Sequence, residues 1–180
     1  SGYWQQPELS QATFAASLSP TAPPVGTPAA ESNCPASDRA AASYLRTGDL
    51  GFIHAEQLFV SGRLKDLIII AGRNYFAHEL EAGVQAAHEA LKVDGGVAFS
   101  YSPEESNDEA GERLVIVQEV LRPKRYPLHE LVECVRAAMA EQFDLAPDAI
   151  LLVPAGSLPK TSSGKLQRRE CCRRYLQDEL

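Results

Sequence analysis

The apolar residues in the second half of the chain change their spacing several times between that of a helix and that of a strand. From residue 66 onward the pattern predicts, in this order, a helix over 80–91, a half-buried strand over 97–101, a strand over 114–120, a helix over 127–143, a strand over 150–153 and a helix after Gly164. These 115 residues are enough for one compact core. We therefore expect an α+β fold, with a short strand pair and a roughly three-stranded sheet that is covered by helices.

The first half is organised differently. Residues 44–52 indicate a strand that ends in a Gly-containing turn, and residues 58–70 indicate two strands around Ser61-Gly62. Residues 19–43 are rich in Pro and Ala and carry almost no large apolar side chains, which is typical of a loop or a disordered, low-complexity insertion. The short apolar segment before it is too small to fold alone, so we expect it to belong to a larger domain.

Charge and cysteine content exclude several classes of function. With 17 Lys plus Arg against 24 Asp plus Glu, the net charge of −7 argues against non-specific nucleic-acid binding. No apolar run approaches the roughly 20 residues of a membrane span. The four cysteines show no CxxC spacing and no companion His cluster, so we predict no metal site and no disulfide framework, and a cytoplasmic location.

Asp49 is the first of several candidate functional residues, and it stands between Gly48 and Gly51. The glycines allow a tight turn at the end of a strand, which leaves the carboxylate exposed. Its two oxygens match the two hydroxyls of a ribose diol. The alternative is an Asp that stabilises its own turn.

The second candidate segment surrounds a short apolar strand. Arg63, Lys65 and Asp66 precede it, and Gly72-Arg73-Asn74 turn the chain afterwards. Arg63 offers a planar set of donors that suits ribose oxygens or a phosphate. The alternative is a polar loop and a turn that only bound a buried strand.

The third candidate is the Gly/Ser-rich loop that ends in Gly164-Lys165. It fails the template of a nucleotide-phosphate loop, because Leu166 stands where a magnesium-binding Ser or Thr is required. The loop instead presents Lys165 on a mobile segment, where an ammonium group can neutralise charge that develops on a phosphoryl group. A solvated surface lysine is the alternative.

A basic segment follows the loop. Residues 157–174 carry six Lys or Arg against Glu170 alone, and they include Arg168, Arg169 and Arg173. No aromatic stacking platform for RNA lies beside them apart from Tyr175. An acidic protein partner or a phosphorylated arm fits better, and an ordinary basic helix face remains the alternative.

Taken together and in this order, the three segments resemble the adenylate-forming enzyme superfamily, and most closely its fatty acyl-AMP ligase branch. The resemblance covers nearly the whole chain except the insertion at 19–43, and it also includes Gly2-Tyr3-Trp4. It implies that residues 1–64 are the tail of a large N-terminal domain and that residues 65–180 are the mobile C-terminal (lid) domain, with a hinge near residue 65. Ala71 and Ala77 depart from the family's usual residues, which leaves the loop geometry and the carrier preference open.

The resemblance also implies roles for single residues. Asp49 and Arg63 would bind the ribose of ATP or AMP, Lys65 would be the hinge and Lys165 the catalytic lysine of adenylate formation. Gly72, Arg73 and Asn74 would line the path of the pantetheine thiol. Arg168, Arg169 and Arg173 would form a docking surface for a carrier protein.

The activity that the resemblance implies is the ATP-dependent activation of a fatty acid to acyl-adenylate and pyrophosphate, followed by acyl transfer to an acyl carrier protein. ATP and Mg would be bound mainly by the large N-terminal domain, so this chain is expected to be inactive alone. The alternatives are a long-chain acyl-CoA ligase that uses free CoA, and a non-catalytic module that docks a carrier protein or RNA.

Overall fold

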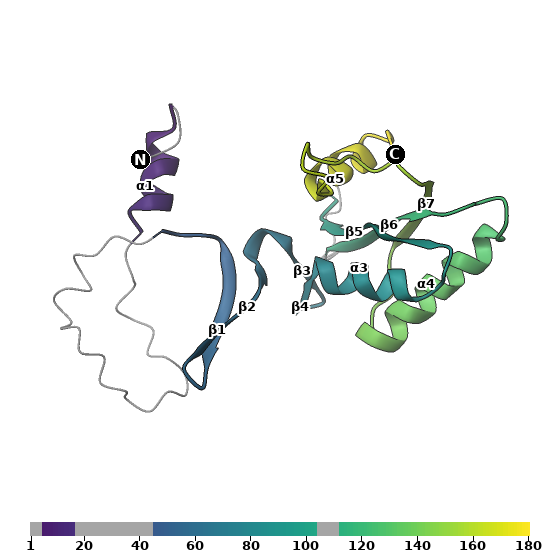
Figure 1. Cartoon of the computed structure of the whole chain (residues 1–180), viewed down its shortest axis with the longest axis horizontal. Coiled ribbons are helices and arrows are strands. Elements are labelled where there is room, and N and C mark those ends of the chain that lie inside the picture. Colours follow the sequence, from purple (N-terminus) through teal and green to yellow (C-terminus); the bar gives the residue numbers. More distant parts are fainter. Residues whose placement is uncertain (1–4, 17–44, 104–111) are drawn as a thin grey trace. The chain divides into compact units, whose positions relative to one another are not determined.

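The computed structural model describes residues 5–16, 45–103 and 112–180, and the chain divides into two compact units, Ser1–Ser61 and Gly62–Leu180 (Figure 1). The predicted insertion at 19–43 lies outside the described residues. The assignment of residues 1–64 to a larger N-terminal domain remains a prediction.

The first unit contains a short helix and a pair of strands. Helix α1 spans Pro7–Phe14, and strands β1 (Asp49–His54) and β2 (Gln57–Arg63) pair with each other, although the last two residues of β2 already belong to the second unit. Two expectations were wrong here. Asp49 begins strand β1 rather than following a strand, and β2 runs straight through the turn predicted at Ser61-Gly62. The break comes only at the 3-10 turn η1 (Leu64–Asp66).

The second unit contains a short strand pair, but it is not the pair predicted within residues 58–70, because its second strand lies where a turn at residues 72–74 was expected. Strands β3 (Leu67–Ile70) and β4 (Arg73–Phe76) are antiparallel, with Ile70 opposite Arg73. Ala71 and Gly72 form the two-residue turn and have φ angles of 50° and 75°. Two positive φ angles are the mark of a type I′ turn, whose twist matches that of the flanking strands.

A mixed sheet of three strands forms the centre of the second unit, in the order β5-β6-β7. Strand β5 (Leu91–Tyr101) runs antiparallel to β6 (Arg113–Val120), and β7 (Ala149–Pro154) runs parallel to β6. Helix α4 (Leu128–Phe143) lies in the connection between the two parallel strands, which need a crossover of this kind.

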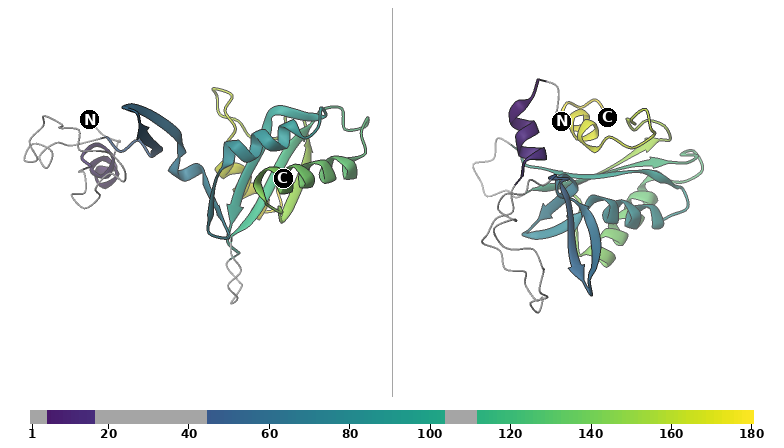
Figure 2. Two further views of the ribbon diagram at one scale, coloured as in Figure 1. Left: turned by 90° about the horizontal axis from the view of Figure 1, so that it is seen from below. Right: turned by 60° about the vertical axis from the view of Figure 1, so that its left-hand side comes forward.

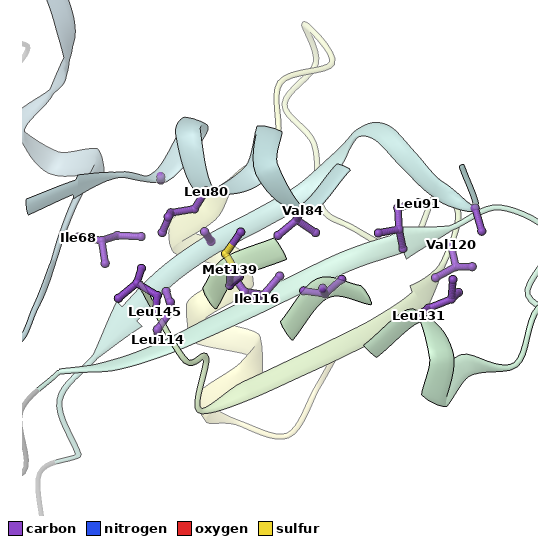
Figure 3. Packing of buried hydrophobic residues seen from close by; sticks show 14 residues of the cluster. Ile68, Leu80, Val84, Leu91, Leu114, Ile116, Val120, Leu131, Met139 and Leu145 are labelled. Carbon is purple, nitrogen blue, oxygen red and sulfur yellow. The ribbon is translucent and has the colours of Figure 1, made fainter. Parts of the chain in front are cut away.

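Helices cover both faces of this sheet (Figure 2). Helix α3 (Ala77–Ala86) and α4 pack on one face, where Leu80, Ile116 and Met139 meet in the main core (Figure 3). Helix α5 (Arg168–Leu176) packs on the other, and its Cys171 is buried in a second cluster. The predicted α+β class, with a strand pair and a three-stranded sheet covered by helices, is confirmed.

Two predictions made from the apolar spacing were wrong. Leu91, expected at the end of a helix, is the first residue of β5, because α3 ends at Ala86. Strand β5 is also not half-buried: Val97, Ala98 and Phe99 are all buried, since both faces of the sheet are covered. Fully covered strands lose the alternation that marks a one-sided sheet.

Candidate functional site

A groove of about 980 Å³ on the second unit brings together most of the predicted site residues of that unit. It is lined by the end of strand β2, the η1 turn, helix α3, the irregular part of β5, the loop that leads into α5 and the first turn of α5. Its charged lining residues are Arg63, Lys65, Asp66, Glu81, Asp94, Lys165, Arg168, Arg169 and Glu170.

Lys165 lies at the end of a closed loop on this groove. Lys160 and Leu166 pair as an isolated antiparallel bridge, and Thr161 joins Lys165 through N–H···O contacts of 2.8 and 3.0 Å. Gly164 takes a φ of 83°, which only glycine adopts without strain, and its N–H donates to the carbonyl of Thr161 at 2.9 Å. The ammonium is exposed, with no hydrogen bond or ion pair to the other described residues.

Lys65 occupies the centre of η1, a single turn that separates β2 from β3. Its side chain is exposed, and the turn is closed by the N–H of Leu67, which donates to the carbonyl of Leu64. One short turn between two strands has few contacts that oppose a change of backbone dihedrals. Its role as the hinge remains a prediction.

Arg168 is bound by carboxylates on both sides. Its Nε and Nη2 each donate to Glu81 at 2.7 Å, and its Nη1 donates to Asp66 at 3.3 Å. The hydrogen bonds that Arg168 donates to Glu81 raise the pKa of Arg168 above its usual value. Because its donors are engaged inside the domain, Arg168 does not present the free charge that a docking surface needs.

The other two arginines of the predicted docking surface differ from each other. Arg173 pairs with Glu170 at 2.8 Å and with Glu179 at 3.2 Å, so its charge is largely neutralised within the second unit. Arg169 is exposed on the groove and makes no ion pair with the residues that the structure describes. The basic segment of the sequence therefore leaves Arg169 and Lys165 exposed at the groove, together with the exposed Lys160 outside it.

The predicted nucleotide-binding pair falls in two units. Asp49 belongs to the first unit, where its N–H donates to the hydroxyl of Thr47 at 3.1 Å, and Arg63 lines the groove of the second. The shared role of these residues in ribose binding remains a prediction.

The predicted pantetheine-side loop is the tip of the β3–β4 hairpin. Gly72 is in the turn, while Arg73 and Asn74 already belong to β4. Arg73 forms an exposed ion pair with Asp144, with 3.0 Å between Nη1 and Oδ2. None of these three residues lines the groove, and the assignment of the loop to a thiol path remains a prediction.

Sequence reasoning missed two carboxylates that organise the site. Glu81 binds Arg168, and the fully buried Glu119 in β6 accepts the N–H groups of Gly156 and Leu158, just before the Lys165 loop. Glu119 carries a signal in the sequence, because it is a charge inside the apolar run of residues 114–120. Glu81 resembles any exposed helix residue until its distant partner is known.

Residues 5–16, 45–103 and 112–180 contain neither a metal-binding cluster nor a membrane-spanning helix. No group of three or more His, Cys, Asp or Glu residues in these ranges could hold a metal ion. None of the described helices has both the length and the apolar character that a membrane span requires.

Known proteins resemble this chain along nearly its whole length. It is 38% identical over 181 residues to the medium-chain-fatty-acid–[acyl-carrier-protein] ligase JamA of Moorena producens. The aligned region covers 99% of this chain and 27% of JamA. The chain is 34% identical over 191 residues to the putative fatty-acid–CoA ligase fadD25 of Mycobacterium tuberculosis, covering 99% and 28%. The chain thus spans about a quarter of the length of these curated relatives.

A solved structure and a family model agree with these relatives. A structure from a study of fatty acyl-adenylate ligases from E. coli and L. pneumophila superimposes with a TM-score of 0.62 and 31% identity, covering 79% of this chain and 24% of that one. The model described as "Disco-interacting protein 2-like, AMP domain" matches residues 65–180, which is more than half of the chain. The chain therefore belongs to the Disco-interacting protein 2-like AMP-domain family, and it is similar to part of proteins of the fatty acyl-adenylate ligase type.

Proposed function

We propose that this chain is the mobile C-terminal domain of an enzyme that activates a fatty acid with ATP and passes the acyl group to an acyl carrier protein. The observation that carries the proposal is the presentation of Lys165: a closed loop holds its ammonium, which none of the described residues binds, at a groove that also contains the η1 turn. The names of the similar proteins support the fatty-acid substrate and the carrier protein.

In the first half-reaction, a carboxylate oxygen of the fatty acid attacks the α-phosphorus of ATP. The bond from that phosphorus to the bridging oxygen of the β-phosphate breaks, and pyrophosphate leaves. Negative charge develops on the phosphoryl oxygens, and the ammonium of Lys165 neutralises it from the groove rim. One such preorganised partner typically contributes about a hundredfold to a thousandfold in rate.

In the second half-reaction, the thiol of the pantetheine arm attacks the acyl carbonyl and loses its proton to solvent, while the bond between the acyl carbon and AMP breaks. The Lys165 loop must then make room for the thiol. A change of backbone dihedrals at Lys65 would turn residues 65–180 as one lid relative to the tail at 1–64. The two exposed cations beside the groove, Arg169 and Lys165, suit the acidic surface of a carrier protein.

Magnesium that accompanies ATP would be held, with the triphosphate, by the other domain of the enzyme. The three described cysteines are free thiols, which supports a reducing, cytoplasmic place of action.

The test is fatty-acid-dependent pyrophosphate release by the full enzyme that contains this chain. Lys165→Ala should lower the rate about a hundredfold to a thousandfold without loss of folding, because it removes one electrostatic partner of the reacting phosphate. Lys160→Ala is the matched control, since Lys160 lies on the same loop but outside the groove. Equal rates for the two variants would refute the proposed role of Lys165.

The acyl product then separates the two ligase types. Acyl transfer to a holo carrier protein, with little product from free CoA, supports the proposal. Efficient formation of acyl-CoA would instead favour a CoA ligase, in line with the name of the fadD25 relative. Pyrophosphate release that does not depend on fatty acid would overturn both the carrier-protein ligase and the CoA ligase as functions of the enzyme.

A further inference from the structure

The guanidinium of Arg168 joins two carboxylates that come from distant parts of the second unit. Glu81 lies 87 residues before it in helix α3, and Asp66 lies 102 residues before it at the end of the η1 turn. The contact to Glu81 is bidentate, with two distances of 2.7 Å, and the contact to Asp66 measures 3.3 Å. One side chain therefore contacts both a core helix and the segment that the proposed function uses as a hinge.

The Glu81 side of this network is anchored in the core. Glu81 is 9% exposed, and its Oε1 also accepts the backbone N–H of Ala98, in edge strand β5, at 3.1 Å. Helix α3, strand β5 and the first residue of α5 thus meet at one carboxylate. Bidentate contacts between Arg and a carboxylate impose geometry as well as energy, so the position of Arg168 is fixed relative to the sheet.

On its other side, Arg168 contacts Asp66, which is the last residue of η1. Both Asp66 and Arg168 are 28% exposed, which leaves the pair only partly screened by water. Directly after Asp66, strand β3 begins and Ile68 is buried in the main core. Directly before it, Lys65 is exposed. The ion pair therefore marks the point at which the chain changes from an exposed turn to the anchored domain.

We propose that Arg168 is a positioning residue that sets where the hinge ends. By holding Asp66 to the core through Glu81, it confines backbone rotation to Lys65 and the residues before it. It also links this boundary to the start of α5, three residues after Lys165, so that the hinge boundary and the Lys165 loop move as one body. The link from Asp66 through Arg168 to Glu81 is called the tether below. The consequence for catalysis rests on the proposed function, whereas the tether itself does not.

Hydrogen exchange on the 180-residue chain tests the tether directly. Asp66→Ala should speed the exchange of the Leu67 amide, which closes η1, by about fivefold, the factor that corresponds to the loss of one partly exposed ion pair. The amides of β6 should change less than twofold. Asp144→Ala is the matched control, because Asp144 is the acidic partner of another arginine, Arg73, which lies at the turn end of the β3–β4 hairpin and not in η1.

Two further readouts separate positioning from a general loss of stability. The Nε–H signal of Arg168 in a nitrogen-15 spectrum should persist in Asp66→Ala, since the Glu81 contact is intact, and should be lost in Glu81→Gln. The urea midpoint of Asp66→Ala should stay near that of the wild type. Parallel acceleration of all amides, or an equal effect of Asp144→Ala on Leu67, would overturn the tether.

In the full enzyme, Asp66→Ala should change the ratio of acyl transfer to adenylate formation by at least about threefold, since a longer hinge alters the closing of the lid. An unchanged ratio alongside faster Leu67 exchange would overturn the positioning role. If the wild-type enzyme releases no pyrophosphate with any fatty acid, the proposed function and the catalytic part of this inference fail together, and the exchange result alone decides the tether.

Discussion

The carboxylate of Glu119, fully buried in the central strand β6, accepts the backbone N–H of Leu158 at 3.1 Å. It also accepts the N–H of Gly156 at 2.8 Å, and the ammonium of Lys92 donates to its other oxygen. Burial alone would raise the pKa of Glu119, but these hydrogen bonds hold it below its usual value. The core thus fixes the chain just before the Lys165 loop.

We expect Glu119→Gln to lower the free energy of unfolding by about 1–3 kcal/mol, because the buried site loses a charged acceptor and leaves Lys92 without its partner. Urea unfolding of the 180-residue chain measures this. Glu112→Gln is the control, since Glu112 is exposed and bonds only to the hydroxyl of Ser100 among the described residues; it should change stability by no more than about 0.5 kcal/mol. Similar stability losses in the two variants would contradict this account.

Arg169 should contribute more than Arg173 to the binding of a carrier protein. Arg169→Ala is expected to weaken the binding of a holo carrier protein about threefold, as for an exposed charge at an interface rim. Arg173→Ala should have a smaller effect, because Glu170 and Glu179 already neutralise that side chain. Calorimetric titration at two salt concentrations measures both, and the Arg169 effect should shrink at high salt. An effect of Arg173→Ala equal to or larger than that of Arg169→Ala would refute this ranking.

The turn at Ala71 stores backbone strain. Ala71 adopts a φ of 50° at the first position of a type I′ turn, where Asn and Gly are preferred. Ala71→Asn should raise the free energy of unfolding by about 0.5 kcal/mol, while the β-branched Ala71→Val should lower it by about 1 kcal/mol. Thermal and urea unfolding test both variants, and a stabilising valine would show that the turn differs from the one described.

Helix α5 should lose stability in acid over a defined range of pH. Hydrogen bonds from Arg173 and Arg174 lower the pKa of Glu170 from 4.5 to about 2. Since the pKa is lower in the folded state, the stabilising contribution is complete above about pH 4.5 and is lost as the pH falls toward 2. A carbon-13 titration of the Glu170 carboxyl should show this low midpoint, and Arg173→Gln should raise it. Arg136→Gln should leave it unchanged, because Arg136 pairs with Glu133 instead.

Local patterns in the sequence were enough to predict most helices and strands of the second unit. Strand β6 and helix α4 were found from their apolar spacing, because each element buries one recurring set of side chains against the core. The predicted turn at Ser61-Gly62 failed, since Gly62 remains in a strand with its backbone against the ring of Phe76. A glycine in a sequence cannot show whether it turns the chain or admits a neighbouring side chain.

The order of the three motifs determined the family, and it singled out Lys165 before any contact was known. Only the tertiary structure shows that Arg168 is engaged, whereas the pairing of Arg173 with Glu170 is a local contact within helix α5. Arg168, Arg169 and Arg173 are equivalent in a count of basic residues, yet the partners of Arg168 lie 87 and 102 residues away. Ion pairs between distant residues depend on how helices and strands pack, and no local pattern encodes that packing. The physical reason is that charge is a property of a residue, whereas its neutralisation is a property of the fold.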